Sequence, residues 1–475
     1  MAEKITIIGS GPGGYWAAVR ASQMGAEVTI IEAEKAGGAC LHWGCIPSKI
    51  MIHTSRMLDG CLRGSEFGIS LPGKPRLDMG RLMTRKTTIL ESISESILKL
   101  LSHHHIRYVN GHADLVENGM VWVKGSREEK IFWDRLIVAS GSMPATLPAL
   151  PVDGKRVLSS DHALDLTEIP ESILIVGGGV IGCEFAFILS LLGSKVTVVE
   201  ALSRLLPIPS VETEASKTIE REMKKKKIQI HLNRIVTSLK QENGKVQVTL
   251  EPYFVIKGTE NGTRQPIRIE AEKVLVCVGR KPKADLIGIE NLGIKTDEKG
   301  WVAVNGRMET SVPNIFAVGD ILGPSRPMLA HVASSEGLVA AENAAGGAKS
   351  MDYSAVPTAI FTTPEVACVG MTEVQAKEKG FDARSDSSLF RSIGKVHVIG
   401  EISGYAKIVS DRKTRKILGM HLVGPHATDL IAQGALAVRA GLTVDFFAET
   451  IFAHPTLSEV LLEVALKACD RPLHG

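Results

Sequence analysis

The sequence has 475 residues, which is too long for one ordinary domain and predicts three or four. Hydrophobic residues make up 44% of the chain and charged residues 23%, which is typical of a globular protein, and a net charge of +3 gives no reason to expect a nucleic-acid partner. No apolar run reaches the ~18 residues of a membrane span, and strand-like sequence begins by Ile5 without a signal peptide, so we expect a cytoplasmic protein.

The N-terminal segment carries the fingerprint of a dinucleotide-binding unit. A buried-strand signal at 5–8 precedes a glycine-rich turn, an Ala-rich helix is predicted over about 15–24, and a second strand at 28–31 ends in Glu32. The glycines of the G-x-G-x-x-G motif are Gly9, Gly11 and Gly14. They allow the backbone to approach a pyrophosphate, whose charge the helix N-terminus stabilises, while the acidic residue accepts from a ribose hydroxyl. The flanking strands and helix make this a strong signal of a bound dinucleotide.

Two cysteines, Cys40 and Cys45, follow in the sequence Gly-Gly-Ala-Cys-Leu-His-Trp-Gly-Cys-Ile-Pro-Ser-Lys at 37–49. A regular helix would hold their Cα atoms about 8.6 Å apart, whereas a disulfide needs roughly 4.4–6.8 Å. If they pair, the backbone must leave a straight helix between them, which Gly44 permits. Two buried, inert thiols are the alternative, but the adjacent fingerprint and Lys49 favour a redox pair. The other five of the seven cysteines lack metal-ligand spacing, which fits a reducing compartment.

The rest of the first unit mixes helix and strand signals. Residues 77–103 are predicted to be helical, and the histidines at 103–105 are interpreted as a solvated helix end rather than a zinc site. Strand signals over 106–138 are interrupted by Asn110-Gly111 and Asn118-Gly119, which predict turns. The prolines that follow, Pro144, Pro148 and Pro151, predict a linker.

A second fingerprint then repeats the first. A strand at 173–176 precedes the glycine-rich turn, a helix is predicted to about residue 192, and a strand at 196–199 ends in Glu200. The motif glycines are Gly177, Gly179 and Gly182. Two complete fingerprints imply two dinucleotides. A carboxylate at Glu200 accepts from a free 2′-hydroxyl and repels a 2′-phosphate, which favours NAD over NADP, although Arg204 close by leaves NADP open.

Two further features precede a change in character of the chain. Asn261-Gly262-Thr263 predicts a hairpin turn. A strand near 315–319 ends in Asp320, and a partner helix is predicted over about 331–345.

The C-terminal part predicts a separate α+β domain at 351–475 without a nucleotide fingerprint. Residues 355–424 alternate like antiparallel strands. Three helical segments follow, near 427–440, 443–450 and 456–468.

A histidine and a glutamate near the C-terminus could supply proton transfer to a redox pair. An ordinary thiol is only about 3% ionised at pH 7, whereas thiol–disulfide exchange needs the thiolate. His454 can take the proton, and a carboxylate bonded to its ring would stabilise the imidazolium, for which Glu459 is the candidate. Pro455 predicts a helix start that would position both side chains. A surface histidine beside a surface helix glutamate is the alternative.

Several motifs together resemble a known family. The most specific are Cys-Leu-His-Trp-Gly-Cys-Ile-Pro-Ser-Lys at 40–49 and His-Pro-Thr-Leu-Ser-Glu at 454–459. Supporting motifs are Val-Gly-Arg-Lys-Pro at 278–282, Ala-Val-Gly-Asp at 317–320 and Met-Leu-Ala-His at 328–331. With the two fingerprints, the chain resembles the flavin-dependent disulfide oxidoreductases over nearly its whole length, and most closely the dihydrolipoamide dehydrogenases.

The resemblance implies an α/β fold with two Rossmann-like dinucleotide-binding domains and a C-terminal α+β dimerisation domain. The implied boundaries are 1–148 for FAD, 149–280 for NAD, 281–350 for a segment that completes the FAD domain, and 351–475 for dimerisation. The implied activity is oxidation of protein-bound dihydrolipoamide with reduction of NAD⁺ to NADH. The partners would be a second copy of the chain and a lipoyl-bearing carrier protein or complex, which we expect to be a separate protein.

The resemblance also assigns roles to residues. Cys40 would exchange with the substrate, Cys45 would face the flavin, and both would form the redox disulfide. His454, as base, and Glu459 would complete the active site of the other subunit. The implied cofactor-binding residues are Gly9, Gly11, Gly14, Glu32, Lys49, Gly111, Ser140, Gly141, Ser142, Gly177, Gly179, Gly182, Glu184, Glu200, Gly279, Asp320, Met328, Leu329, Ala330 and His331. Among them, Lys49 would pair with Glu184 near the flavin, and Asp320 would hold the ribityl chain.

Three departures from the family pattern concern the substrate face of the redox pair and the FAD site. His42 and Trp43 stand where the family more often has Asn-Val, Val332 stands where a lysine is common, and two extra residues lie between Asp320 and Met328. A related flavin disulfide reductase with another disulfide substrate, or with a specialised lipoyl carrier, is therefore the alternative.

Other classes fit less well. NADPH-dependent glutathione and trypanothione reductases are disfavoured by Glu200 with Gly182, and mercuric reductases by the single cysteine, Cys469, near the C-terminus. A non-catalytic subunit of a larger complex is disfavoured because the cysteine pair and the histidine are intact.

Overall fold

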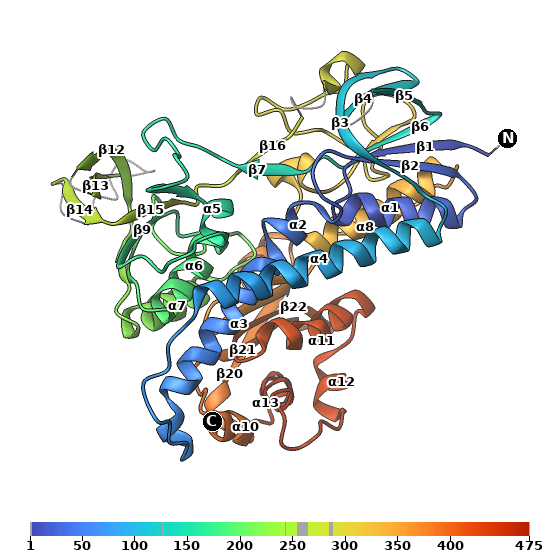
Figure 1. Ribbon diagram of the computed structural model, residues 1–475. Coiled ribbons are helices and arrows are strands. Elements are labelled where there is room, and N and C mark those ends of the chain that lie inside the picture. Colours follow the sequence, from blue (N-terminus) through green and yellow to red (C-terminus); the bar gives the residue numbers. More distant parts are fainter. Residues whose placement is uncertain (1, 126–127, 243, 254–264, 285–287, 475) are drawn as a thin grey trace.

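The computed structural model describes residues 2–474 apart from 126–127, 243, 254–264 and 285–287, so the predicted turn at Asn261-Gly262-Thr263 lies outside the described residues. Two sheet-containing units lie side by side, and a third, C-terminal unit lies below them in Figure 1. The long helices α3 (Cys45–Leu62) and α4 (Met79–His103) run between the units. The histidines at 103–105 lie at the end of α4, as predicted. No helix in the described part of the chain combines the length and hydropathy that crossing a bilayer requires.

The first unit is built on a seven-stranded sheet in the order β17-β6-β1-β2-β3-β4-β5. Its parallel strands are β1 (Lys4–Ile8), β2 (Glu27–Glu32), β3 (Arg107–Glu117), β6 (Arg135–Val138) and β17 (Ile315–Ala317). Two antiparallel strands, β4 (Met120–Gly125) and β5 (Glu129–Phe132), complete one edge. Helices α1 (Pro12–Gln23) and α8 (Ala330–Ala344) pack on each other beside the sheet.

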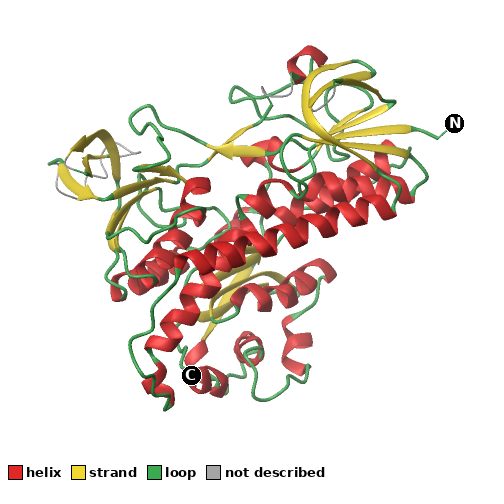
Figure 2. Cartoon of the chain, viewed as in Figure 1, coloured by secondary structure: helices red, strands yellow, loops and turns green. Residues whose placement is uncertain are grey.

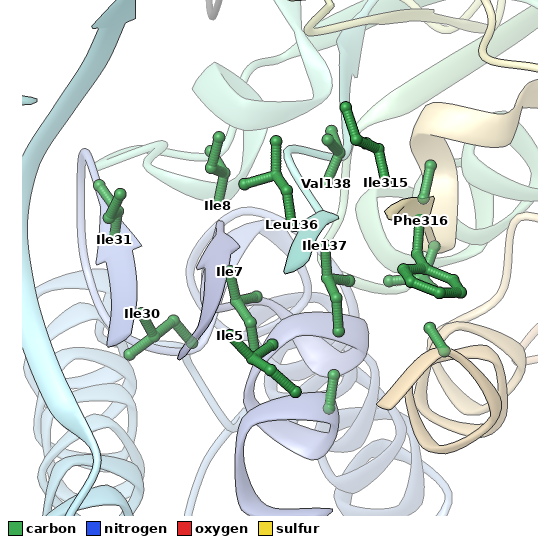
Figure 3. Packing of buried hydrophobic residues seen from close by; sticks show 14 of the residues in the cluster. Ile5, Ile7, Ile8, Ile30, Ile31, Leu136, Ile137, Val138, Ile315 and Phe316 are labelled. Carbon is green, nitrogen blue, oxygen red and sulfur yellow. The ribbon is translucent and has the colours of Figure 1, made fainter. Parts of the chain in front are cut away.

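Strands β1, β6 and β17 of this sheet are mostly apolar because both of their faces are covered. Ile7 and Ile137 belong to one core with Phe316, and each is at most 3% exposed. Figure 3 shows the side chains of neighbouring strands packed along the sheet. Burial on both faces requires apolar residues in these strands, and those apolar residues are the signal by which the sequence predicts them.

One of the two predicted Asn-Gly turns is wrong. Asn118-Gly119 connects β3 to β4, as predicted, but Asn110-Gly111 lies inside β3, where Asn110 pairs with Glu32 of β2. Gly111 faces Gly125 of β4, and a Cβ atom there would lie 2.6 Å from the Val123 side chain. The glycine therefore permits close strand approach rather than a turn.

The second unit has a parallel five-stranded sheet in the order β11-β10-β9-β15-β8. Its strands are β8 (Val157–Ser159), β9 (Ser172–Val176), β10 (Lys195–Val199), β11 (Gln229–His231) and β15 (Lys273–Val276). Its helices are α5 (Ser160–Leu164), α6 (Val180–Leu191) and α7 (Thr213–Lys225). An antiparallel sheet of β12 (Arg234–Glu242), β13 (Lys245–Pro252) and β14 (Ile267–Ala271) lies beside it. The pair β7 (Ser142–Pro144) and β16 (Arg280–Pro282) connects the two nucleotide-type units, visible in Figure 1.

The C-terminal unit is an antiparallel sheet in the order β18-β19-β22-β21-β20. Its strands are β18 (Thr358–Ile360), β19 (Glu365–Gly370), β20 (Ala383–Leu389), β21 (Tyr405–Asp411) and β22 (Ile417–Gly424). Its helices are α9 (Glu373–Glu378), α10 (Gly394–Ile399), α11 (Ala427–Ala440), α12 (Val444–Glu449) and α13 (Glu459–Ala468). Strands β21 and β22 are buried throughout, because α11 and α13 contact the sheet and the second unit packs against it too.

The remaining helices are short. They are α2 (Gly38–His42), η1 (Gly64–Phe67), η3 (Ile289–Leu292), η4 (Gly319–Ser325) and η5 (Phe390–Ser392). Figure 2 shows how helices and strands divide between the three units. The predicted helix start at Pro455 is wrong, because α13 begins at Glu459. The domain boundaries at 148, 280 and 350 stay a prediction.

Candidate active site

One cavity of about 1560 Å³ receives side chains or backbone from all three units. Cys40, Cys45 and Trp43 line it. Every residue predicted to bind a cofactor lines it too, except Gly14 and Gly182. The cavity thus joins the two fingerprints and the cysteine pair in one continuous space.

The first fingerprint glycines have three different environments. A Cβ atom on Gly9, whose φ is +101°, would lie 2.3 Å from the Ala139 carbonyl oxygen, and one on Gly14 would lie 1.9 Å from the Gly9 oxygen. No atom lies within 4 Å of the Cβ position on Gly11, which faces the cavity. Gly14 therefore serves the close packing of α1 on β1, while Gly11 leaves bare backbone where a pyrophosphate can approach.

The second fingerprint reproduces this arrangement. A Cβ atom on Gly177, at φ +110°, would lie 2.2 Å from the Cys277 oxygen, and one on Gly182 would lie 1.9 Å from the Gly177 oxygen. Gly179 again faces open space in the cavity. The repeat in sequence is therefore a repeat in geometry, and each half offers the N-terminus of a helix to a phosphate.

A buried carboxylate lies at the end of the strand that follows each fingerprint helix, β2 in the first unit and β10 in the second. Glu32 accepts hydrogen bonds from Ser10 N (2.8 Å), Ser10 Oγ (2.7 Å) and Glu34 N (2.9 Å). Glu200 accepts from Gly178 N (2.6 Å) and Leu202 N (2.8 Å). Both carboxylates also line the cavity, so each holds its glycine turn and presents negative charge to a ribose.

Arg204 is not directed at the nucleotide cavity. Its guanidinium donates to the Val211 oxygen (2.9 Å), the Ile208 oxygen (3.0 Å) and Ser216 Oγ (2.8 Å). Burial lowers the pKa of this guanidinium. The arginine that left NADP open in the sequence is therefore engaged in holding the loop that leads to α7.

The FAD side of the cavity has polar groups prepared for a ligand. Among the described residues, Ser140 Oγ is buried without a hydrogen-bond partner, and no atom lies within 4 Å of the Cβ position on Gly141, whose φ is +74°. Asp320 accepts from Ser142 Oγ (2.6 Å), which in turn accepts from Arg280 Nε (2.6 Å). An orphaned hydroxyl, bare backbone and an oriented carboxylate fit the ribityl and phosphate groups of a flavin dinucleotide. Sequence reasoning missed Arg280, although it lies in the Val-Gly-Arg-Lys-Pro motif.

The backbone between the two cysteines leaves a straight helix, which is the geometry that a disulfide between them would need. Helix α2 ends at His42 and α3 begins at Cys45, with Gly44 at φ −149° and ψ −112° between them. A Cβ atom on Gly44 would lie 2.9 Å from the Ala39 oxygen, so a side chain would obstruct this break. His42 and Trp43, the two residues between the cysteines that depart from the family pattern, lie in different surroundings. His42 Nε2 lies 2.9 Å from the Ala36 oxygen, whereas Trp43 lines the cavity.

The two cysteines are free thiols joined by a hydrogen bond, and their pKa values are displaced in opposite directions. The hydrogen bond from Cys40, helped by the Lys49 charge, outweighs burial and the Glu184 and Asp320 carboxylates and lowers the pKa of Cys45 to about 7. The same hydrogen bond, with burial, raises the pKa of Cys40. Cys45 is therefore the thiolate of the pair near neutral pH.

Lys49 pairs with Glu184 beside the cysteines. Its Nζ lies 3.1 Å from Glu184 Oε1 and 3.0 Å from Oε2, and the Glu184 side chain is only 6% exposed. This pair joins α3 to α6 of the second unit. Val332, where the family often has lysine, is buried in α8 at 2% exposed, so a charge there would be costly.

His454 and Glu459 form a pair outside the cavity of their own chain. His454 Nδ1 lies 2.7 Å from Glu459 Oε1, and Thr456 N donates to Glu459 Oε2 at 2.9 Å. Burial would raise the pKa of Glu459, but the hydrogen bonds from His454 and Thr456 outweigh it and lower the pKa. The His454 side chain is 75% exposed and does not line the cavity that receives Cys40 and Cys45 of its own chain.

Comparison with known proteins defines the class. Residues 3–337 match the pyridine nucleotide-disulphide oxidoreductase family, and residues 356–465 match its dimerisation domain. The chain therefore belongs to the pyridine nucleotide-disulphide oxidoreductases. The predicted fold class, the oxidoreductase class and the FAD and NAD cofactors are confirmed by this membership, and the dimerisation domain supports the predicted homodimer.

Individual relatives agree over the full length. Dihydrolipoyl dehydrogenase of Chlamydia muridarum is 39% identical over 470 residues, covering 98% of this chain and 97% of that protein. Dihydrolipoyl dehydrogenase of Bacillus subtilis is 38% identical over 481 residues, covering 99% and 98%. Among solved structures, LpdA of Mycobacterium tuberculosis superposes with a TM-score of 0.88 at 26% identity, covering 98% and 99%. The HOCl-induced flavoprotein disulfide reductase RclA of Escherichia coli, as a Cu(II) complex, gives 0.84 at 26%, also covering 98% and 99%.

Proposed function

We propose that this protein oxidises protein-bound dihydrolipoamide to lipoamide and reduces NAD⁺ to NADH, as a homodimer in the cytoplasm. The observation that carries the proposal is the single cavity lined by both fingerprints and by Cys40 and Cys45. Two full-length relatives above 37% identity carry the name of this activity. A lipoyl-bearing carrier protein or complex is the proposed macromolecular substrate.

The chain's own residues account for the dithiol half of the reaction. With Cys40 and Cys45 as a disulfide, His454 accepts a proton from one substrate thiol, and the resulting thiolate attacks the Cys40 sulfur. The Cys40–Cys45 bond breaks and Cys45 leaves as a thiolate, which its low pKa of about 7 favours. The second substrate thiol then attacks the substrate sulfur bonded to Cys40, the bond to Cys40 breaks, and Cys40, whose pKa is raised, takes up the proton of that thiol. The substrate leaves as a disulfide and the enzyme pair is reduced by two electrons.

Residues of both units would hold the cofactors. Gly11, Glu32, the buried Ser140 and Asp320 fit FAD in the first unit, while Gly179 and Glu200 fit NAD in the second. When bound, FAD supplies the two-electron route by which NAD⁺ reoxidises the cysteine pair. Lys49 and Glu184 lie where this route meets the cysteines.

We propose that His454 acts on the cavity of the second subunit. His454 and Glu459 are paired with each other and do not line the cavity of their own chain, which supports the proposal that a second copy brings them to the cysteines. The dimerisation-domain match over 356–465 includes both residues.

NAD is the proposed nicotinamide cofactor. Glu200 holds negative charge at the cavity wall, where it would repel a 2′-phosphate, and Arg204 donates to backbone oxygens and to Ser216 instead of facing the cavity.

Reduction of NAD⁺ and NADP⁺ by free dihydrolipoamide, followed side by side, tests the proposal. Fast turnover with NAD⁺ and little with NADP⁺ is the expected result. Bound FAD with a reducible cysteine pair but no turnover with either nucleotide would overturn it. Such a result would point to another disulfide substrate, selected by the unusual Trp43 at the cavity wall.

A further inference from the structure

Three units meet at the lysine that follows the cysteine pair. Lys49 of α3 binds Glu184 of α6, and Phe361, the residue after β18, contacts both. The Phe361 N–H donates to Glu184 Oε1 at 3.0 Å, and Lys49 Nζ lies 4.4 Å from the centre of the Phe361 ring. All three residues line the cavity.

Phe361 contacts both the Lys49 ammonium and the Glu184 carboxylate. A ring 4.4 Å from an ammonium attracts it through the cation–π interaction and keeps water from that side. The backbone N–H satisfies one oxygen of a carboxylate that is only 6% exposed. The Lys49 side chain is 31% exposed, so without the ring it has room to move toward solvent.

The position of this charge pair matters because Cys45 lies one helical turn before Lys49. The charged and titratable groups that face Cys45 are Cys40 of α2, Lys49, Glu184 of α6 and Asp320 of η4. Lys49 is the cation among them, and it stabilises a thiolate, whereas the Glu184 and Asp320 carboxylates oppose it. A small displacement of Lys49 therefore changes the balance at the sulfur.

We propose that Phe361 is a positioning residue whose ring holds Lys49 where its charge favours the Cys45 thiolate. The inference rests on the proposed redox role of Cys45 but not on the identity of the dithiol substrate. It assigns to the C-terminal unit a direct influence on the reactivity of a cysteine in the first unit.

The test is a pH titration of the ultraviolet absorbance of thiolate in holoenzyme reduced with one equivalent of a phosphine, with the Cys45→Ser variant subtracted. Phe361→Leu removes the ring and keeps the backbone N–H. We expect its Cys45 midpoint to rise by about 0.5–1 pH unit, which is roughly a three- to tenfold loss of thiolate below the midpoint. Phe361→Tyr retains the ring and should keep the wild-type midpoint. Phe132→Leu is the matched control, because Phe132 is 63% exposed on β5 of the first unit.

A wild-type midpoint in Phe361→Leu would overturn the proposal, as would an equal shift in Phe361→Tyr. Phe361→Met keeps apolar volume without a ring and decides the question if the leucine variant does not fold or loses its flavin. If the wild-type protein cannot oxidise dihydrolipoamide, the proposed substrate is wrong. The titration uses a chemical reductant, so its result still tests the role of Phe361 in that case.

Discussion

Replacing Glu459 by glutamine isolates the carboxylate that supports His454. The His454 Nδ1–Glu459 Oε1 distance of 2.7 Å is that of a charge-assisted hydrogen bond, which contributes about 1.5–3 kcal/mol. Glutamine preserves shape, but its single oxygen can accept either from Thr456 N or from His454 Nδ1, so the change removes the negative charge and one of the two acceptors. Since 1.36 kcal/mol corresponds to a tenfold change, we expect kcat with dihydrolipoamide to fall by about ten- to a hundredfold. The KM should change little, because the imidazolium forms during the reaction.

The assay compares steady-state dihydrolipoamide oxidation with reduction of an artificial one-electron acceptor by NADH, which bypasses the cysteine pair and should be unchanged. The chain offers a matched control on the same helix, since His474 Nδ1 and Glu463 Oε1 form an equivalent pair at 3.0 Å. Glu463→Gln should keep the wild-type kcat. A wild-type kcat in Glu459→Gln, or equal losses in both variants, would refute the reasoning.

Three further predictions follow from particular contacts. Cys45→Ser should retain FAD and lose dithiol turnover, because no disulfide can form; measurable wild-type turnover would contradict the scheme. Gly179→Ala should fold normally and raise the KM for NAD⁺ roughly tenfold, whereas Gly182→Ala, with its Cβ 1.9 Å from the Gly177 oxygen, should lower the free energy of unfolding by about 1–3 kcal/mol. Equal stability of the two glycine variants in urea would be the contrary result. Burial raises the pKa of Asp153, but hydrogen bonds from Gln241 and three backbone N–H groups outweigh it and hold the pKa well below its usual range. This stabilisation is fully present above the unfolded pKa of about 3.9 and is lost progressively as the pH falls from there through the lowered folded pKa, so Asp153→Asn should cost about 1 kcal/mol at pH 7 and progressively less as the pH falls below about 4. An unchanged urea midpoint at pH 7 would contradict this.

Prediction from the sequence succeeded where the local backbone geometry allows only one type of residue. Glycine spacing located both nucleotide turns, since Gly9 and Gly177 adopt positive φ against a neighbouring carbonyl and no other residue fits. Gly44 was predicted to permit a break in the helix between the cysteines, and the break lies at this residue. In these places the requirement is set within a few residues along the chain.

Prediction failed where tertiary contacts override local preference. Asn110-Gly111 has the composition of a turn, but pairing with strands on both sides keeps it extended. Pro455 is typical of a helix start, but helix α13 begins only at Glu459, whose carboxylate accepts a hydrogen bond from Thr456 N. Lys49 and Glu184 are 135 positions apart, so only the family resemblance indicated their pairing. Phe361 contacts both of them without any signal in its own surroundings in the sequence.

Helix α3 has a consequence for how the molecule can move. Along its length Lys49 bonds to Glu184 and Asp59 to Lys226 of the second unit, while Arg56 bonds to Glu365 of the C-terminal unit at 2.8 Å. A hinge between the two nucleotide units would have to break the two ion pairs to the second unit together with the packing of α3 on α6. Because α3 begins at Cys45, a change in the separation of the nucleotide units would act on the same helix that carries this cysteine.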